Sequence, residues 1–389
     1  MKKKVLIVFK YPRGNWNKPV INKFSNYYDT EHLYISDYSN KNFTEVVNDI
    51  NDLIKSKSIE IAVFDVDYFK FINFFFIESI NCKKKILITG DDFELHEINS
   101  ISASACDLVL SHCPFSVLKY REKGYQAHTI DYETGIVNKN VPPKKEIDVL
   151  FFGNITPGRK ELLNYIVSEG VALKNIGYEK DTHGVAEEEL TKLVSNSKIV
   201  LNLSKSRTTS VKSFASENIY KYYYQFKGRI IIAGLNGALC VSEYSPGQEL
   251  LFQNNEIPTF FTKEQCVKIL KELLSNEKLL LEHTKKFTLR SQELFEDKKS
   301  FEPIYNLIEN IKSQKVKLIK IPYWYLRISA KQIILRNMKL FNLISSIAQF
   351  KVIFKIIRGS NLPIKLLIIS ETILNILWYS FALTLKPKK

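Results

Sequence analysis

Short apolar runs that alternate with helical patterns constrain the fold of this 389-residue chain most strongly. The first run is VLIVF at residues 5–9, in which every residue is apolar, as is typical of a strand buried on both faces of a parallel sheet. We predict further strands at 32–36, 59–64, 85–89, 107–111 and 127–131. Helical patterns cover 44–55 and 115–123, whereas the Gly- and Pro-bearing segment 11–19 is expected to be a loop. The sequence therefore predicts an α/β fold.

The alternation stops at the stiff polar segment VPPKK, residues 141–145, and then starts again. Strands are predicted at 148–152, 174–177, 199–203 and 238–241, and helices at 160–169, 187–196, 229–237, 263–274, 277–295 and 300–312. We therefore expect two Rossmann-like domains, residues 1–140 and 146–314, that face each other across a cleft.

Positive charge is concentrated in the last part of the chain, residues 315–389. This segment carries eleven Lys and three Arg against one acid, Glu371, so it holds a net +13 of the chain's +15. The remaining residues carry only +2, which argues against a nucleic-acid-binding body. We expect a basic amphipathic helical tail that binds an anionic membrane surface.

The end of the tail, residues 366–385, is apolar for about the width of a membrane. Glu371 and Asn375 interrupt it one helical turn apart, which favours a helix lying in the membrane interface over a span. The Tyr and Trp residues at 323–325 are typical of an interface as well. The alternative is a helical extension that packs on its own body or on another subunit.

The five cysteines are odd in number and scattered, with no zinc-type spacing. Free thiols in a reducing compartment are the simpler interpretation. The apolar run after the N-terminal lysines is too short for a signal-peptide core. Both observations favour a cytoplasmic protein.

Three motifs occur in a fixed order along the chain. They are DDFELH with DLVLSHCPFSVLKYREKGYQAHTID after residue 90, DVLFFGNITPGRKELL with HGVAEEELTKLVSNSKIVLNLS in residues 148–204, and GRIIIAGLNGALCVSE in residues 228–243. Together they resemble the CgeB-type (spore maturation protein B, glycosyltransferase group 1-like) branch of the GT-B glycosyltransferases. The resemblance covers most of residues 85–312 and is absent after residue 315. It implies a nucleotide-sugar donor bound to the second domain and an acceptor bound to the first.

The loop between the strand at 148–152 and the next helix is the first candidate for donor binding. Gly153, Asn154 and Thr156 allow backbone amides to approach a phosphate at the helix N-terminus. Arg159 and Lys160 can offset phosphate charge, or they can simply form a solvated first turn. After the strand ending at residue 203, Lys205 and Arg207 offer two more cations in a loop that is equally consistent with a solvated surface segment.

The helix at 229–237 and the strand after it supply the remaining donor candidates. Gly237 is expected to stop the helix, and Arg229 matches the family pattern, although it can also form a surface ion pair. Many nucleotide-sugar transferases carry a ribose-binding Glu five residues before this glycine, where the present chain has Ile232. We expect Glu243 or Glu249 to replace that Glu, unless the donor is unusual or the site is inactive.

Inverting transfer needs a base within reach of the acceptor hydroxyl. Asp91, Asp92 and His96 follow the strand at 85–89, where the cleft is expected, and Asp92 or His96 is the candidate base. Asp91 can instead cap the next helix. The pair Asp65 and Asp67 spells a DxD motif, but that metal motif belongs to GT-A folds, so we expect neither a metal nor another cofactor.

The sequence therefore predicts a glycosyltransferase, peripheral on the cytoplasmic face of a bacterial membrane, that transfers a sugar to a lipid-linked or cell-surface glycan such as lipopolysaccharide. Its partners would be a nucleotide sugar, the glycan acceptor and anionic lipid, with no nucleic acid. Two alternatives remain open: a non-catalytic scaffold that kept the fold, and an epimerase-like enzyme that turns over a nucleotide sugar without an acceptor.

Overall fold

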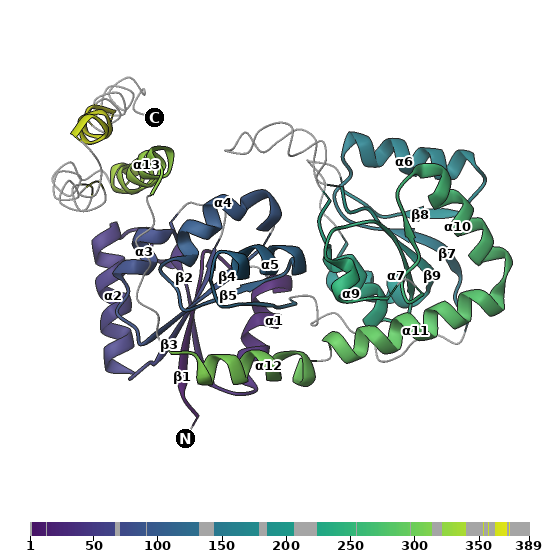
Figure 1. Ribbon diagram of the computed structural model, residues 1–389, viewed down its shortest axis with the longest axis horizontal. Coiled ribbons are helices and arrows are strands. Elements are labelled where there is room, and N and C mark those ends of the chain that lie inside the picture. The colour runs from purple at the N-terminus through teal and green to yellow at the C-terminus, as the bar shows by residue number, and fades with distance from the viewer. Residues whose placement is uncertain are drawn as a thin grey trace, which may run out of the picture.

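The computed structural model shows two domains, each built on one parallel sheet with helices on both faces (Figure 1). It describes residues 2–12, 14–66, 71–90, 92–131, 144–178, 185–205, 224–253, 255–295, 297–312, 321–339, 353, 357, 362–371 and 373.

The first domain has a six-stranded sheet in the order β2-β1-β3-β4-β5-β6, with every pair parallel. Its strands are β1 Lys4–Phe9, β2 Asp29–Tyr34, β3 Ile61–Val66, β4 Lys84–Thr89, β5 Leu108–Ser111 and β6 Ala127–Thr129. Its helices are α1 Gly14–Ser25, α2 Phe43–Ser56, α3 Phe74–Ser79, α4 Asp92–Ala103 and α5 Pro114–Glu122, with a short 3-10 turn at Ile35–Tyr38.

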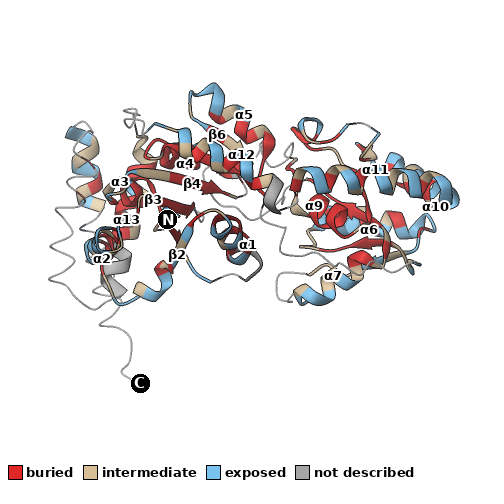
Figure 2. Cartoon of the chain, turned by 90° about the horizontal axis from the view of Figure 1, so that it is seen from below, coloured by how far each residue is buried: buried red, intermediate tan, exposed pale blue. Residues whose placement is uncertain are grey.

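Alternate residues of each central strand enter two separate cores. In β1, Leu6 and Val8 join the core under α2, α3 and α4, whereas Val5, Ile7 and Phe9 join the core on the opposite face with α1. Both sets are fully buried, which explains why the strand is a continuous apolar run and not an alternating one. Figure 2 shows the strands as the buried layer between helices whose outer faces are exposed.

The second domain has a five-stranded parallel sheet in the order β11-β10-β9-β7-β8. Its strands are β7 Ile147–Phe151, β8 Leu173–Asn175, β9 Ser197–Asn202, β10 Leu239–Glu243 and β11 Thr259–Phe260, with a 3-10 turn at Gln248–Leu250. Its helices are α6 Pro157–Ser168, α7 Glu187–Ser195, α9 Gly228–Leu235, α10 Lys263–Ser275 and α11 Glu277–Phe295.

The predicted strands are found within a few residues of their expected bounds, but one predicted loop is a helix. The segment 11–19 was expected to be a loop because of its Gly and Pro residues, yet α1 begins at Gly14 and contains Pro19 in its second turn. Val20 and Phe24 of this helix are fully buried, so their tertiary packing outweighs the low helix propensity of the Gly and Pro residues. The two-residue strand β11 is too short to give a sequence pattern.

Helix α12, Asp297–Asn310, belongs to the first domain. The sequence predicted instead that it is part of the second domain, with bounds 146–314. Its Phe301, Ile304 and Ile308 are buried in the core that contains α1 and one face of the first sheet. Lys23 of α1 donates to Asp131 at 3.2 Å and to Ser300 of α12 at 3.0 Å, and both charged side chains are buried. A buried polar cluster therefore fixes the returning chain on the first domain.

The first helix of the tail, α13 Tyr323–Lys339, also packs on the first domain. Tyr325, predicted to be an interfacial aromatic, is fully buried. Its hydroxyl accepts a bond from the Phe74 amide at 2.9 Å and shares one with Ser102 at 3.3 Å. This part of the predicted membrane tail is therefore a component of the first domain, because the body of the protein provides the tyrosine's hydrogen-bond partners.

Farther along the tail, residues 362–371 are helical. Glu371 accepts a bond from Arg327 of α13 at 2.6 Å, so the acid that interrupts the apolar run is paired with a base in the same tail. Among the described residues no helix is long and apolar enough to cross a membrane. Most of the predicted segment 366–385 lies outside the described residues.

The two domains touch near the carboxyl ends of β5 and β10. Gly247, with φ of +90°, lies so close to the start of α5 that a Cβ at this position would be 2.7 Å from the Phe115 amide nitrogen. On the same side, the His112 ring packs on Phe226 with 5.9 Å between centroids. The carboxyl edges of the two sheets therefore meet, as the two-domain prediction requires.

Replacing Lys23 tests the buried cluster. Lys23→Ala leaves the Asp131 carboxylate buried without its ammonium partner, and we expect the free energy of unfolding to fall by about 3–5 kcal/mol. Urea denaturation followed by circular dichroism measures this loss. The control is Lys57→Ala, which breaks the partly exposed pair with Glu31 and should cost about 0–1 kcal/mol. Equal effects of the two substitutions would contradict the proposed role of the cluster.

Candidate functional site

The order of the second sheet reverses between β7 and β9. The chain leaves β7 toward β8 on one side and continues from β9 to β10 and β11 on the other. Helices α6 and α10 pack together on one face, and α7, α9 and α11 on the opposite face (Figure 1). In open parallel sheets, ligands bind at the carboxyl ends of the strands where the order reverses. The ends of β7 and β9 are therefore the place to look for a site.

A helix begins directly at this point. Thr156 is the N-cap of α6, its hydroxyl accepts from the Arg159 amide at 3.4 Å, and Pro157 occupies the first turn. The remaining amides of the first turn point out of the helix and give its N-terminus a partial positive charge. This end of α6 is therefore suited to an anionic group, as the sequence predicts.

Arg159 acts as a brace in this structure, that is, its side chain connects two loops through hydrogen bonds. This role differs from the predicted contact with a phosphate. Its guanidinium donates to the carbonyl oxygens of Asn154 at 2.7 Å, Leu203 at 3.2 Å and Lys205 at 3.2 Å. The side chain is buried, and it joins the loop after β7 to the loop after β9. The predicted bidentate contact with a phosphate would compete with these bonds, so the geometry favours a positioning role.

Arg229 makes the matching connection from the other face of the sheet. From α9 it donates to the side-chain oxygen of Asn202 at 3.1 Å, to the Phe152 carbonyl at 3.0 Å and to the Leu203 carbonyl at 2.8 Å. It is buried as well, so the surface ion pair considered in the sequence analysis is excluded. The Leu203 carbonyl thus accepts from two arginines, one from each face.

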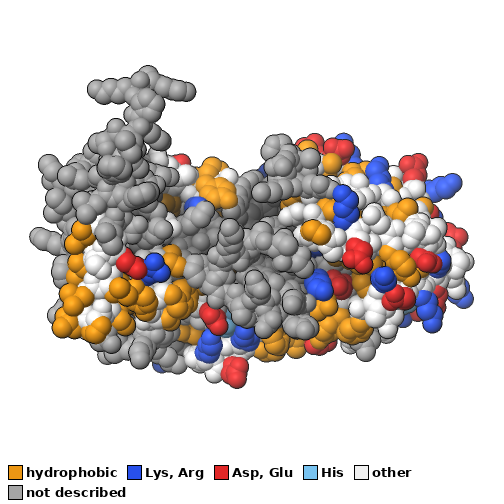
Figure 3. All heavy atoms as spheres, turned by 90° about the horizontal axis from the view of Figure 1, so that it is seen from above, with side chains coloured by type: hydrophobic (Ala, Val, Ile, Leu, Met, Phe, Trp, Pro, Cys, Tyr) orange, Lys and Arg blue, Asp and Glu red, His pale blue; other side chains and the backbone are white. Residues whose placement is uncertain are grey.

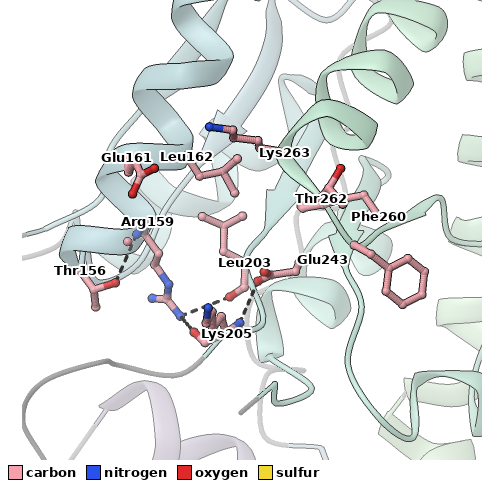
Figure 4. Close-up of a pocket in the computed structure, with 12 residues that line it drawn as sticks. Thr156, Arg159, Glu161, Leu162, Leu203, Lys205, Glu243, Phe260, Thr262 and Lys263 are labelled. Carbon is pink, nitrogen blue, oxygen red and sulfur yellow. Dashed lines mark hydrogen bonds between the residues drawn. The ribbon is translucent and has the colours of Figure 1, made fainter. Parts of the chain in front are cut away.

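A pocket of about 280 Å³ opens beside these braces, between α6, α10 and the carboxyl ends of β9, β10 and β11 (Figure 4). Two lysines and two glutamates line it together with apolar side chains and parts of the loops. The lining residues are Thr156, Gly158, Arg159, Glu161, Leu162, Leu203, Lys205, Glu243, Phe260, Phe261, Thr262 and Lys263. The mixture of apolar walls and a few charged groups is typical of a small-molecule site.

Glu243, at the end of β10, is held close to Lys205. Its Oε2 accepts from the Lys205 amide at 2.9 Å. Burial raises the pKa of Glu243, while hydrogen bonds from the backbone of Lys205 and Ser204 and the charges of Lys205 and Arg159 oppose the rise. The pocket thus contains a partly buried carboxylate next to cationic groups.

The other described residues that were predicted to bind the donor do not line this pocket. Gly153 and Asn154 form the loop behind it, and Lys160 is exposed on α6. Gly237, with φ of +72°, ends α9 in the left-handed conformation, which is a structural role. Glu249 is exposed and accepts from the Tyr244 hydroxyl at 3.4 Å, outside the pocket lining. Arg207 lies outside the described residues.

The candidate bases are buried inside the first domain. Asp92 is 1% exposed and accepts bonds from Asn99, Ser111 and Tyr120, each at 2.8 Å. Burial raises its pKa, and these hydrogen bonds oppose the rise. A carboxylate with three protein donors and almost no exposure is a structural group, so the geometry does not support the predicted base role of Asp92.

His96 is 3% exposed and packs on the Tyr120 ring. Burial, and then the charges of Lys119 and Lys123, lower its pKa to about 3, so the imidazole is neutral at physiological pH. Neutrality would suit a base, but the buried ring does not reach the surface of the cleft in this conformation. Asp91 lies outside the described residues.

Sequence reasoning missed the side of the pocket formed by residues 260–263. A strand of two residues leaves no pattern, and Lys263 looks like an ordinary first-turn residue of α10. The available signal was the capping box, in which Thr262 accepts from the Gln265 amide and marks a helix N-terminus at the carboxyl edge of the sheet.

Residues 144–295 match the model of the glycosyl transferase-like family (Glyco_trans_1_2). This segment contains most of the second domain and all of the pocket. A search of curated protein sequences finds no match.

Several solved structures share the two-domain fold. The Anabaena protein Alr3699/HepE in complex with UDP-glucose is 11% identical, with a TM-score of 0.56, and the match covers 79% of this chain and 100% of that one. An alpha-glucosyltransferase in complex with UDP and a 13-mer DNA is 12% identical, with a TM-score of 0.50 and coverage of 80% and 100%. Sucrose-phosphate synthase from Thermosynechococcus elongatus is 10% identical, with a TM-score of 0.50 and coverage of 79% and 99%.

At these identities the structural matches establish the fold, and they confirm the predicted GT-B architecture. The family match adds that the second domain, residues 144–295, is similar to a glycosyl transferase-like domain. The finer assignment to the CgeB-type branch stays a prediction.

Gly153 offers a test of the brace at the site. Its φ is +107°, and a Cβ there would lie 2.4 Å from an Arg229 nitrogen, so Gly153→Ala introduces both strain and a clash. We expect a loss of about 1–3 kcal/mol in the free energy of unfolding. The control is Gly158→Ala in the first turn of α6, where a Cβ meets nothing within 4 Å and stability should be unchanged or slightly higher. Urea denaturation of both variants measures these changes. A Gly153→Ala protein as stable as the wild type would contradict the bracing role of Arg229 at this loop.

Proposed function

We propose that this protein transfers a sugar from a nucleotide-sugar donor to a lipid-linked or cell-surface glycan, at the cytoplasmic face of a bacterial membrane. The observation that carries the donor half of this proposal is the pocket at the carboxyl edge of the second sheet, beside the N-terminus of α6. A nucleoside diphosphate needs an apolar surface for the base, and donors or cations for the phosphates. The pocket supplies both.

Each part of the donor has a matching part of the site. The α6 N-terminus, Lys205 and Lys263 offer positive charge to the diphosphate. Leu162, Leu203 and Phe260 offer apolar surface to the base. Arg159 and Arg229 hold the two loops that carry these groups, and their buried charge adds to the positive potential without direct contact.

The acceptor half rests on the tail. Leu362, Leu366 and Leu367 in the helix at 362–371, together with Ile373, are between 44% and 67% exposed, which is unusual for four apolar side chains in one short segment. Hydrophobic side chains gather at this end of the molecule (Figure 3). Ile368, on the opposite side of the helix, is buried. An apolar stripe on a strongly basic segment fits an anionic lipid surface.

The position of the tail links lipid binding to the acceptor. Because Tyr325 anchors α13 on the first domain and Arg327 pairs with Glu371, the exposed stripe is attached to the domain expected to bind the acceptor. A protein held on the membrane through this stripe would keep that domain near lipid-linked substrates. The proposal includes no nucleic-acid partner, since almost all of the excess charge lies in the tail.

Nucleotide binding tests the donor half. In a thermal-shift screen of UDP, GDP, TDP and CMP, we expect one nucleotide to raise Tm, because a ligand at about 100 times its Kd stabilises the folded state by about 2.7 kcal/mol. Release of the nucleotide from its sugar conjugate should need a glycan acceptor. Lys263→Ala should weaken binding about tenfold. Lys268→Ala, on the exposed side of the same helix and outside the pocket lining, should leave it unchanged.

Other results would favour the rival functions. Binding without any turnover would favour a scaffold, a possibility that Ile232 raises. Turnover of the nucleotide sugar without an acceptor would favour an epimerase-like enzyme. If no nucleotide binds, the donor proposal fails.

Liposome flotation tests the membrane half. The double variant Leu366→Asp, Leu367→Asp places two charges on the exposed stripe, so we expect at least a tenfold loss of binding to vesicles containing phosphatidylglycerol. Leu289→Asp, at an equally exposed leucine of α11 in the second domain, is the control and should bind like the wild type. Unchanged flotation of the double variant would show that the stripe is not the membrane contact.

A further inference from the structure

Helix α9 presents no carboxylate to the donor site. Ile232 occupies the position where many nucleotide-sugar transferases carry a ribose-binding Glu, and it is 5% exposed in the apolar core of the second domain. Every residue of α9 from Arg229 to Leu235 is buried, and the helix contains no acid. Recognition of ribose hydroxyls therefore has to come from another element, if it occurs at all.

Among the described residues, Glu161, Glu243 and Glu249 lie near the carboxyl edge of the second sheet, and their surroundings differ. Glu161 is exposed on α6, and Glu249 is exposed and accepts from the Tyr244 hydroxyl. Glu243 alone among the three is partly buried in the pocket and fixed by a backbone bond, from the Lys205 amide at 2.9 Å. Figure 4 shows its side chain between Lys205 and the segment at Phe260.

The chemistry of Glu243 selects hydroxyl groups as its partners. A carboxylate repels phosphate, so it cannot bind the diphosphate directly. It can accept about four hydrogen bonds, and the backbone of Lys205 and Ser204 uses only part of that capacity. Two neighbouring hydroxyls can donate to one carboxylate, and a nucleotide carries such a pair on its ribose, one phosphate ester away from the cations of the site.

We propose that Glu243 accepts hydrogen bonds from the 2′- and 3′-hydroxyls of the donor ribose, in place of the acid missing at position 232. The protein then selects ribonucleotides over 2′-deoxyribonucleotides. This inference rests on the proposed donor function, and it adds a residue that determines specificity. It places ribose recognition at the end of strand β10 and not on helix α9.

The test compares ribonucleotides with their deoxy forms in the full-length protein. The probes are UDP, GDP and CMP and the corresponding 2′-deoxy nucleotides, and binding is measured by calorimetry. We expect the wild type to bind the preferred ribonucleotide at least tenfold more tightly than its 2′-deoxy form, because the deoxy form leaves a buried charged acceptor with one partner fewer. Glu243→Ala should bring this ratio close to one, and Glu243→Gln should give an intermediate value.

Glu249→Ala is the matched control, since it removes an acid outside the pocket, and its ratio should equal that of the wild type. Thermal unfolding of each variant verifies that the fold is retained. If nucleotides bind but Glu243→Ala keeps the wild-type ratio, or if the wild type binds a 2′-deoxy nucleotide as tightly as its ribonucleotide, the ribose assignment is wrong while the donor site stands. If Glu243→Ala changes only the preference between UDP and GDP, Glu243 reads the base and the assignment is again wrong. If no nucleotide binds the wild type, the donor function itself fails.

Discussion

The shape of the pocket at the edge of the second sheet depends on one carbonyl group, that of Leu203. It accepts hydrogen bonds from Arg159 at 3.2 Å and from Arg229 at 2.8 Å, which reach it from helices on opposite faces of the sheet. Each arginine also bonds to a carbonyl at or after the end of β7. Hydrogen bonds from charged donors stabilise by about 1.5–3 kcal/mol each. These bonds hold the β7 and β9 loops at a fixed separation, and the pocket forms beside them.

The same kind of long-range connection builds the first domain from both ends of the chain. Lys23 bonds to Ser300, and Tyr325 bonds to the Phe74 amide, so α12 and α13 return to a sheet made by the first part of the sequence. Among the described elements, the chain passes from the first domain to the second between β6 and β7 and returns between α11 and α12. A consequence is that helix α13, the first part of the tail, packs on the first domain and not on the second.

The sequence predicts structural features that depend on neighbouring residues. It does not predict the role of a side chain whose hydrogen-bond partners are distant in the sequence. The run VLIVF predicts a strand buried on both faces, and Asn236-Gly237 predicts the end of α9, because both patterns are local. Arg159 lines the pocket, but its role depends on carbonyls 5, 44 and 46 residues away. Tyr325 is a residue type that is common at membrane interfaces. Only its hydrogen bond with the amide of Phe74, which is distant in the sequence, reveals that it is buried.

Charge explains why the acid of the site should lie on a strand end. Arg229 uses the N-terminal turn of α9 to brace the sheet, and the rest of this short helix packs into the apolar core, so a carboxylate at position 232 would be buried in hydrocarbon. The end of β10 is different: burial raises the pKa of Glu243 there, but the Lys205 amide and the charges of Lys205 and Arg159 oppose that rise. Arg159, which helps to fix the pocket, thus also favours Glu243 over α9 as the place for its carboxylate.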